Sequence, residues 1–233
     1  MPTPLEMLLD PVSLIILALI ATLLLLEHLV PGRKQPKAKG YLPLIWDNYL
    51  SSYQLMNLES LNPYLSAFIA LLIFEFLVYV WHRAMHQTKW LWRTFHQMHH
   101  SAERVDVLGA FYFSPLDMIG FTMLGSLSLV VVIGVTPQAA TYFLYASIFL
   151  AVFQHTNIKT PQWLGYIFQR PESHSLHHAT GVHRYNYSDL PLFDILFGTF
   201  KNPKDFAEQT GFYEGASARI PEMLVFKDVA KPK

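Results

Sequence analysis

Residues 64–86 have the sequence YLSAFIALLIFEFLVYVWHRAMH, an apolar run that ends in two histidines four positions apart. One acid, Glu75, interrupts the run between Tyr64 and Trp81. Because a helix of about 20 apolar residues crosses a bilayer, this run predicts a membrane span. A charged side chain in lipid is costly, so we expect Glu75 to face other helices. There it would bond a ligand histidine or cap a packed polar pair.

Further apolar runs have the same character, and they cover Val12–Val30, Leu116–Val135 and Gln138–Gln154. The last two are separated by Thr136 and Pro137, which predicts an antiparallel helical hairpin. No Lys or Arg precedes the first run, and no small-residue cleavage site follows it, which favours a span over a signal peptide. The predicted fold class is therefore all-α: an integral membrane bundle of about four transmembrane helices with a His-rich cytoplasmic cap.

The composition supports a membrane protein and excludes several classes of site. Of the 233 residues, 52% are hydrophobic and 15% are charged, and 17 basic residues balance 17 acidic ones. A soluble domain carries about 25% charged residues. A chain without excess positive charge is not expected to bind nucleic acid. The absence of cysteine excludes disulfides, thiolate zinc sites, iron–sulfur clusters and a thiol nucleophile on this chain.

The distribution of Lys and Arg predicts the orientation. Segments 82–115 and 155–233 contain 13 of the 17 basic residues, so the positive-inside rule places both in the cytoplasm. The other four, between Arg33 and Lys39, would then lie outside by simple alternation of spans. Either the polar, aromatic-rich segment 41–58 is re-entrant rather than interfacial, or the rule is outweighed locally.

Histidines gather in three motifs: His82-Arg-Ala-Met-His86, His96-Gln-Met-His99-His100 and His174-Ser-Leu-His177-His178. Residues three and four apart share a helix face, so the imidazoles of each motif can point together at a metal. With His155 at the end of the fourth run, nine candidate nitrogen ligands lie on one membrane face. Imidazole suits Fe, Zn, Cu or Ni, and nine ligands exceed what one ion can use, which favours a two-metal centre. His183 is a ligand or a neighbour of ligands, whereas the isolated His28 is expected to be a packing or interfacial residue.

These motifs, followed by NYSDLPLFDILFGTF at residues 186–200, resemble the fatty acid hydroxylase superfamily over about residues 64–203. The resemblance implies an integral membrane oxygenase in which histidines bind two iron ions, with zinc as a substitute. By this resemblance, nine histidines match the metal-binding pattern of the family: His82, His86, His96, His99, His100, His155, His174, His177 and His178. We keep His183 as a tenth candidate ligand, although many relatives lack histidine there. Asn186, Asp194 and Phe197–Thr199 match the signature after the last motif and are expected to brace the cap.

The resemblance also predicts the domains. Residues 1–63 would hold the N-terminal transmembrane helix and the interfacial segment, residues 64–203 the membrane di-metal hydroxylase domain, and residues 204–233 a C-terminal tail. Acids expected to bond imidazole N–H groups are Glu103, Asp106, Asp117, Glu172, Asp189 and Asp194.

The implied reaction uses O2 to hydroxylate or desaturate a lipid, which could be a fatty acyl chain, a sterol or a related molecule. Its electrons would come from a separate ferredoxin, cytochrome or reductase, because the chain has neither cysteine nor a GxGxxG motif. The basic residues Arg93, Arg104, Lys201 and Lys204 would dock an acidic carrier or merely set the topology.

Other classes of protein fit the histidines less well. A metalloprotease needs HExxH, but position 83 is Arg. A divalent-metal transporter would place its ligands near the bilayer midplane rather than at span ends. A bis-histidine haem protein would use two histidines rather than nine. The alternatives to an oxygenase are therefore a transporter or a metal-binding membrane scaffold without redox chemistry.

Overall fold

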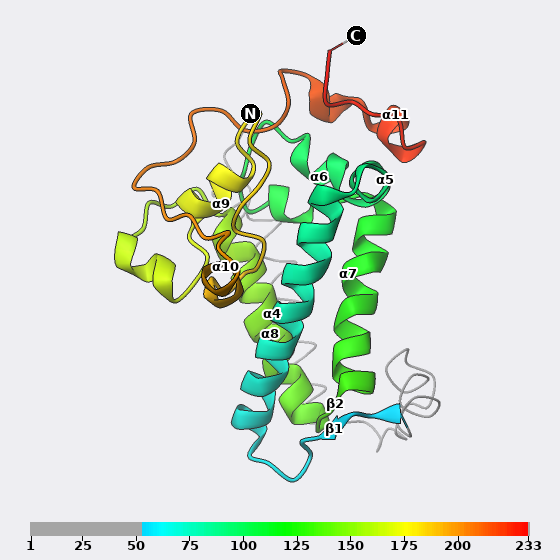
Figure 1. Cartoon of the computed structure of the whole chain (residues 1–233), viewed down its shortest axis with the longest axis vertical. Helices are drawn as coiled ribbons and strands as arrows, with labels where there is room; N and C mark the ends of the chain where they lie inside the picture. The colour runs from blue at the N-terminus through cyan, green and yellow to red at the C-terminus, as the bar shows by residue number, and fades with distance from the viewer. Residues whose placement is uncertain (1–52, 233) are drawn as a thin grey trace, which may run out of the picture. The chain divides into compact units, whose positions relative to one another are not determined.

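The computed structural model of the chain describes residues 53–232, labelled as in Figure 1. The predicted first span Val12–Val30, His28 and residues 41–52 of the segment 41–58 lie outside the described residues. The chain divides into two units between Ile45 and Trp46, and all described residues belong to the second unit.

Three long helices form the body of this unit, and each begins with a polar cap followed by proline: α4 (Pro63–Gln87), α7 (Pro115–Leu127) and α8 (Pro137–His155). The side chains of Asn62, Ser114 and Thr136 accept hydrogen bonds from backbone N–H groups in the first turns. Proline suits the first helical position because its missing N–H would have no partner there. The sequence therefore determines where these helices start.

The predicted apolar runs correspond to these helices. The run Tyr64–Trp81 lies within α4, which continues to Gln87 and so includes the first histidine motif. The run Leu116–Val135 forms α7, a π-helical turn (η4, Ser128–Val132) and the strand β2 (Ile133–Gly134). Then α8 returns antiparallel to α7 from its Thr136 cap. Among the helices in residues 53–232, α4 alone is long and apolar enough to cross a membrane. The number of spans stays a prediction.

Helix α4 packs against α8 and α7. The α4–α8 contact uses small buried side chains, Ala67 and Ala70 on α4 and Ala139 on α8, which let the backbones approach closely. Beside them, the rings of Phe74 and Phe143 meet edge to face at a centroid distance of 5.2 Å. These residues lie in the first halves of α4 and α8, whereas the histidines lie at the ends of both helices.

The outward faces of the three long helices are apolar and exposed. Side chains at least 49% exposed include Leu65, Phe68, Ile119, Met123, Ile148 and Phe149. Contiguous exposed apolar surface marks contact with lipid or with another protein.

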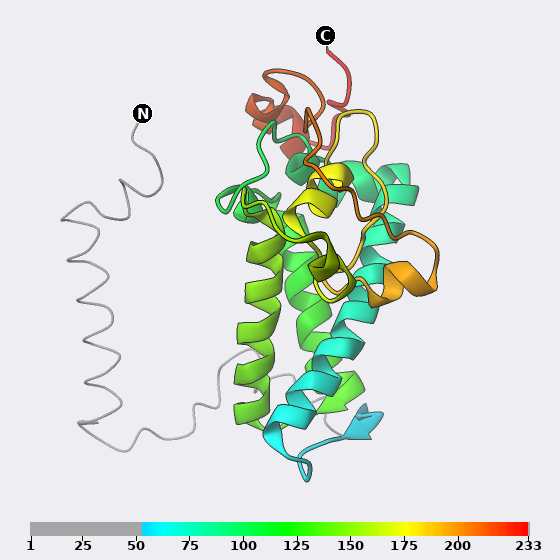
Figure 2. The same ribbon diagram turned by 90° about the vertical axis from the view of Figure 1, so that its left-hand side faces the viewer.

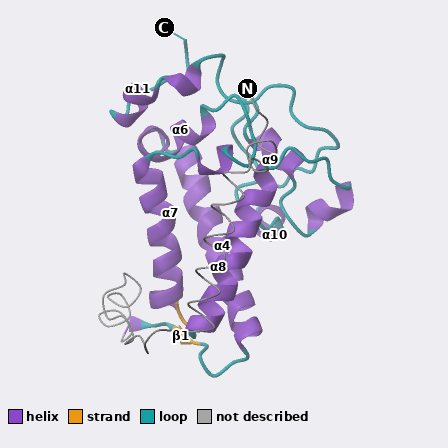
Figure 3. Ribbon diagram, turned by 180° about the vertical axis from the view of Figure 1, so that it is seen from behind, coloured by secondary structure: helices purple, strands orange, loops and turns teal. Residues whose placement is uncertain are grey.

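The two strands lie at the end of the bundle where α7 meets α8 (Figure 3). Strand β1 (Met56–Asn57) pairs in parallel with β2, Met56 opposite Ile133. This short pair ties the segment before α4 to the turn between α7 and α8.

Short helices and loops gather at the opposite end of the bundle and extend along one side of it, where α10 packs against the middle of α4 (Figure 1). They comprise α5 (Lys89–Leu91), the π-helix η2 (Trp92–His96), α6 (Gln97–His100), η3 (Gly109–Phe111), η5 (Gln162–Tyr166), α9 (Pro171–His177), α10 (Leu192–Leu196), η6 (Ala216–Ala218) and α11 (Ile220–Leu224). The side chains of Met98, Phe212, Ala216, Met223 and Val229 form a second apolar core there. Which side of a membrane this cap faces stays a prediction.

Candidate metal centre

Four segments bring histidines to the cap end of the bundle. His82 and His86 lie in the last turns of α4, and His155 is the last residue of α8. The second motif spans η2 and α6, and the third lies on α9 and its cap. Because α4 and α8 both end at the cap, their terminal histidines meet the histidines of the short helices.

Nine of the ten candidate histidines form two groups, and within each group one ring nitrogen of every member lies within 4.8 Å of those of the others. The five-histidine cluster contains His82, His86, His96, His100 and His177. The four-histidine cluster contains His99, His155, His174 and His178. The clusters are adjacent, since the rings of His100 and His178 stack with centroids 4.0 Å apart.

The two HxxHH motifs are divided between the clusters, so the expectation that each motif points together is only partly right. His96 and His100 enter the five-histidine cluster, whereas His99 enters the four-histidine cluster. In the third motif, His177 alone enters the five-histidine cluster. His174 and His178 enter the four-histidine cluster. At about 100° per residue, positions i and i+4 diverge by about 40°, whereas i+3 and i+4 diverge by about 100°. Each motif therefore contributes ligands to both clusters.

Backbone carbonyls of one loop orient three imidazoles of the five-histidine cluster. His82 Nδ1–H donates to the carbonyl of Tyr187 at 2.7 Å, and His177 Nδ1–H donates to that of Tyr185 at 2.7 Å. His86 Nδ1–H donates to the carbonyl of His183 at 2.8 Å. A carbonyl can only accept, so each bond puts the proton on Nδ1 and leaves the Nε2 lone pair free to bind a metal.

Two histidines of the other cluster are held in the same way, and His96 is held by an acid. His155 Nδ1–H donates to the carbonyl of Ala151 at 2.7 Å, and His99 Nδ1–H donates to that of Tyr112 at 3.3 Å. His96 Nδ1–H donates to Asp117 Oδ2 at 2.8 Å, and this carboxylate is fully buried. A carboxylate partner increases the basicity of a ligand imidazole.

These tautomers leave lone pairs facing each other inside both clusters. His82 Nε2 lies 3.0 Å from His177 Nε2, and His99 Nε2 lies 3.2 Å from His155 Nε2. Each of these rings uses its proton at Nδ1, so neither contact is a hydrogen bond between neutral imidazoles. The buried Nε2 atoms of His86 and His100 have no hydrogen-bond partner among the described residues. A cation between the nitrogens of each cluster would satisfy these atoms, so the donor set fits a metal-binding site.

Burial keeps the imidazoles in the neutral, ligating form. Loss of solvent lowers the pKa well below the ordinary value of 6.5 for His96, His99, His100, His174, His177 and His178. Neighbouring imidazoles lower these pKa values further, because a second positive charge nearby is unfavourable. The site is thus prepared to bind cations without first releasing protons at neutral pH.

His183 lies outside both clusters. Its Nδ1 approaches His100 Nδ1 at 3.1 Å, and its carbonyl accepts from His86. If His100 bound a metal through Nε2, its Nδ1–H would donate to His183 Nδ1. His183 thus supports two members of the five-histidine cluster from outside.

Of the acids considered as partners of the imidazoles, Asp117 is the one that contacts a histidine within the described residues. Glu103 bonds Ser217, Asp106 bonds Arg104 and Gly109, Glu172 bonds Arg170 and Thr160, Asp189 bonds Gln154, and Asp194 bonds Tyr187, Ser188 and Thr199. The remaining acids therefore shape the cap rather than the imidazoles directly.

Asn186, Asp194 and Glu75 hold the loop that carries the orienting carbonyls. Asn186 has a left-handed φ of 50°, and its side chain bonds the backbone of Ser173 and Lys201. Asp194 accepts from the N–H groups of residues 187 and 188 at 2.9 Å. Glu75 Oε2 accepts hydrogen bonds from the backbone N–H groups of residues 189 and 190, at 2.9 and 3.1 Å. Glu75 therefore bonds this loop and not a ligand histidine.

Sequence reasoning missed the orienting carbonyls and two aromatic neighbours. A carbonyl leaves no mark in a sequence, although Asn186 tolerates the left-handed conformation that turns this loop. Phe113 stacks on His99 at 4.5 Å, and Trp92 lies 4.9 Å from His86 and 5.1 Å from His100. Trp92 precedes the second motif by four residues, which is the helical spacing that could have indicated it.

Comparison with known proteins identifies the family of the chain. The family model described as fatty acid hydroxylase matches residues 67–199, which include all ten candidate histidines. The chain is 32% identical over 139 residues to the very-long-chain aldehyde decarbonylase GL1-9 of Oryza sativa subsp. indica, covering 56% of this chain and 52% of the relative. It is 31% identical over 139 residues to the ornithine lipid hydroxylase OlsE of Rhizobium tropici, covering 58% and 41%.

Cholesterol 25-hydroxylase of Rattus norvegicus is 28% identical over 145 residues, covering 57% of this chain and 46% of the relative. The chain thus spans about half the length of the curated relatives it matches. No solved structure matches it significantly. Because the matched region covers more than half of the chain and contains both histidine clusters, the protein belongs to the fatty acid hydroxylase family.

Proposed function

We propose that this protein is a membrane-bound non-haem di-iron oxygenase that uses O2 and external electrons to hydroxylate or desaturate a lipid. The observation that carries the proposal is the pair of adjacent histidine clusters, in which Nε2 lone pairs of neutral imidazoles face one another. One iron ion in each cluster would satisfy these nitrogens.

Iron is proposed because of the chemistry that lipids demand. Cleavage of an unactivated C–H bond needs an oxidant stronger than any side chain, and a redox-active metal supplies it. Zinc also binds imidazole well and could occupy the same nitrogens, but it has no redox chemistry. The proposed ligands are the members of the two clusters, with His183 as their neighbour.

For hydroxylation the reaction is R–H + O2 + 2 e⁻ + 2 H⁺ → R–OH + H2O. Desaturation removes two hydrogen atoms from neighbouring carbons and forms two waters from the same reactants. The carbonyls of Tyr185 and Tyr187 hold His177 and His82 in place, and Asp117 holds His96. The rings of Phe113 and Phe121, 6.1 Å apart, form an apolar wall beside the clusters that would exclude water.

A lipid substrate is supported by the relatives, whose names specify cholesterol, an ornithine lipid and sphinganine. It is also supported by the exposed apolar faces of α4, α7 and α8. We propose that these faces contact the bilayer, that the chain crosses it several times, and that the histidine end lies in the cytoplasm. The electrons would come from a separate ferredoxin, cytochrome or reductase.

The first test is the metal content of detergent-purified protein. The wild type should hold about two metal ions per chain, iron being the redox-active one. His177→Ala and His99→Ala should each lose metal, because each removes a nitrogen from a different cluster. His183→Asn is the matched control, since asparagine also tolerates its left-handed φ of 40°, and it should retain the metal.

A second measurement links the metal to the reaction. Iron-loaded protein, supplied with chemical reductant and O2, should convert a lipid extract to hydroxylated or desaturated products, and His177→Ala should not. If the wild-type protein is folded but holds no metal, the proposal is wrong. Bound metal with transport but no oxidised product would favour a divalent-metal transporter, and bound metal without either would favour a scaffold.

A further inference from the structure

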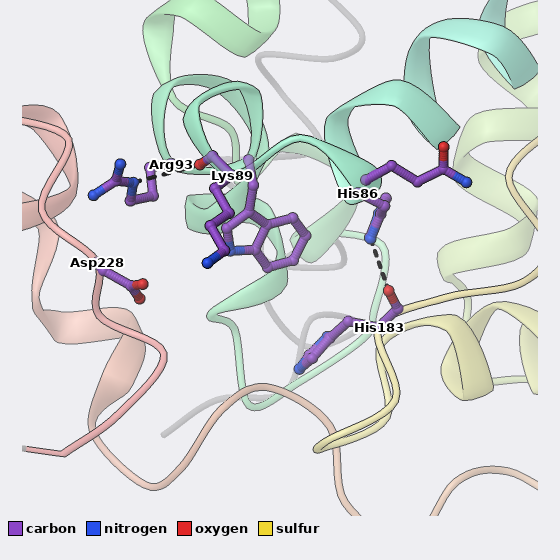
Figure 4. A pocket seen from close by; sticks show the side chains of 7 residues that line it. His86, Lys89, Arg93, His183 and Asp228 are labelled. Atoms are coloured by element: carbon purple, nitrogen blue, oxygen red, sulfur yellow. Dashed lines mark hydrogen bonds between the residues drawn. The ribbon is translucent and has the colours of Figure 1, made fainter.

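A polar cavity of about 450 Å³ opens beside the five-histidine cluster (Figure 4). Its walls come from the end of α4, from α5 and η2, from the loop at residue 183 and from the C-terminal segment. The lining residues are His86, Gln87, Lys89, Trp92, Arg93, His183 and Asp228. It differs from two apolar concavities on the bundle, around Ile119 and around Phe149, which contain no histidine.

Two residues on the wall of the cavity connect it to the five-histidine cluster. His86 lines the cavity and also belongs to the five-histidine cluster. Trp92 also lines the cavity, and its ring lies 4.9 Å from that of His86 and 5.1 Å from that of His100. Two aromatic systems thus connect the cavity directly to the cluster.

A π-helical turn places Trp92 there. The N–H of Gln97 bonds the carbonyl of Trp92, five residues earlier, so η2 is wider than an α-helix. Trp92 and His96 therefore both approach the cluster, 6.2 Å apart by ring centroids. Helices of this kind are rare and frequently occur at functional sites.

The mouth of the cavity carries exposed positive charge. Lys89 and Arg93 are exposed, lie four residues apart, and form no ion pair among the described residues. Asp228 is the one acid of the lining, and it lies on the C-terminal segment across the cavity. Two unpaired cations against one carboxylate make this surface complementary to an acidic partner.

We propose that this cavity is the docking site of an acidic one-electron carrier protein, and that Trp92 and His86 conduct its electrons to the five-histidine cluster. The proposal rests on the proposed function, which needs two electrons for each O2. Two reduced carriers would each lose one electron in turn, and each would leave oxidised. A nicotinamide would not serve, because it transfers a hydride and the described residues include no hydride acceptor.

The test measures binding and electron transfer separately. The probes are an acidic [2Fe–2S] ferredoxin and an acidic cytochrome, titrated against the iron-loaded protein in detergent at low and high salt. One of the two carriers is expected to bind. Reversing both charges in Lys89→Glu/Arg93→Glu should weaken its affinity roughly tenfold at low salt. Asp228→Asn should strengthen it by about two- to fivefold, and the difference should shrink with salt.

Lys201→Glu/Lys204→Glu is the control for overall charge, because it reverses the same number of charges at exposed lysines on another segment that do not line the cavity. Trp92→Leu should leave the affinity unchanged and slow oxidation of the reduced carrier at least tenfold, and Trp92→Phe should restore part of the rate. Metal content and reduction by dithionite are measured for every variant and should match the wild type.

Equal weakening by Lys201→Glu/Lys204→Glu, unchanged affinity in Lys89→Glu/Arg93→Glu, or undiminished carrier oxidation in Trp92→Leu would overturn the proposal. The absence of salt-sensitive binding by either carrier would also overturn it. Failure of the proposed function is distinguishable, because the wild type would then form no product even with dithionite as reductant.

Discussion

At the scale of single residues, His82 and His177 show how the site is prepared for a cation. Each ring donates its Nδ1 proton to a carbonyl, and their Nε2 atoms then face each other at 3.0 Å. Two lone pairs at this distance repel unless a proton or a metal lies between them. Burial opposes protonation of His177, whose pKa is well below 6.5, so a metal ion is the better partner.

Asp117 is the residue whose charge acts most directly on a candidate ligand. It is fully buried at the start of α7, and its Oδ2 accepts from His96 Nδ1–H at 2.8 Å. Asp117→Asn keeps the shape but removes the negative charge that makes His96 a better donor to metal. Loss of such a partner typically lowers metal affinity or activity 10- to 100-fold.

We therefore expect Asp117→Asn to weaken metal binding by about tenfold, measured by competition with a chelator. Glu103→Gln is the matched control, because Glu103 bonds Ser217 and contacts no histidine of the described chain. Equal metal affinity of Asp117→Asn and the wild type would mean that the carboxylate only positions the ring.

At the scale of elements, the loop at residues 183–190 is bonded to α4 and orients three of the candidate ligands. Its carbonyls orient His82, His86 and His177, and its N–H groups are held by Asp194 and Glu75. Three of its residues other than glycine have positive φ, which costs backbone energy and persists only where the surroundings hold it.

Glu75 gives the test of this element. Glu75→Leu would leave the N–H groups of Asp189 and Leu190 without their acceptor, at a cost of about 1–3 kcal/mol each. We expect faster hydrogen exchange at these two amides and metal affinity weakened by about tenfold. Glu75→Gln retains one carbonyl oxygen that can accept both bonds, so it should behave much more like the wild type. Identical exchange in Glu75→Leu and the wild type would show that other contacts hold the loop.

At the scale of the whole molecule, the buried histidines couple folding to pH. Burial lowers the pKa of those in the cap well below 6.5, and the pKa of His183 falls to about 4. A histidine with a lower pKa in the folded state binds protons more readily after unfolding. Its effect on the unfolding free energy is therefore absent well above pH 6.5, and stability falls as the pH drops below this value.

Buried acids of the cap act in the opposite direction, and burial raises the pKa of Asp194 above its ordinary value. Burial raises the pKa of Asp189 to about 6, so its protonation stabilises the folded state as the pH falls towards 4. Because the buried histidines of the cap outnumber these carboxyls, the net effect is loss of stability in acid. We expect the unfolding free energy of the metal-free protein to fall by about 1.4 kcal/mol per pH unit for each extra proton bound on unfolding.

Denaturant titrations of the detergent-solubilised, metal-free protein at pH 7.5, 6.5 and 5.5 would measure this dependence. Bound metal should shift the loss of stability to lower pH, since protons and metal compete for the same nitrogens. A stability that is flat between pH 7.5 and 5.5 would show that the clusters are open to water in solution.

The sequence by itself determined the long helices and indicated that histidines make up the site. Apolar runs and cap–proline pairs are local signals, so α4, α7 and α8 start close to their predicted positions. The repeated histidine motifs indicated nitrogen ligands and a centre with two metals, because helical spacing converts sequence distance into direction. The first predicted span lies outside the described residues, and the membrane topology stays a prediction.

Only the tertiary structure decided which histidines meet. His82 and His177 are 95 residues apart in sequence, and their contact depends on how α9 sits against the end of α4. The same packing sends His99 and His177 away from their motif neighbours, leaves His183 outside both clusters and turns Glu75 towards a loop. Spacing describes one helix at a time, whereas carbonyl directions and contacts between helices depend on the whole folded chain.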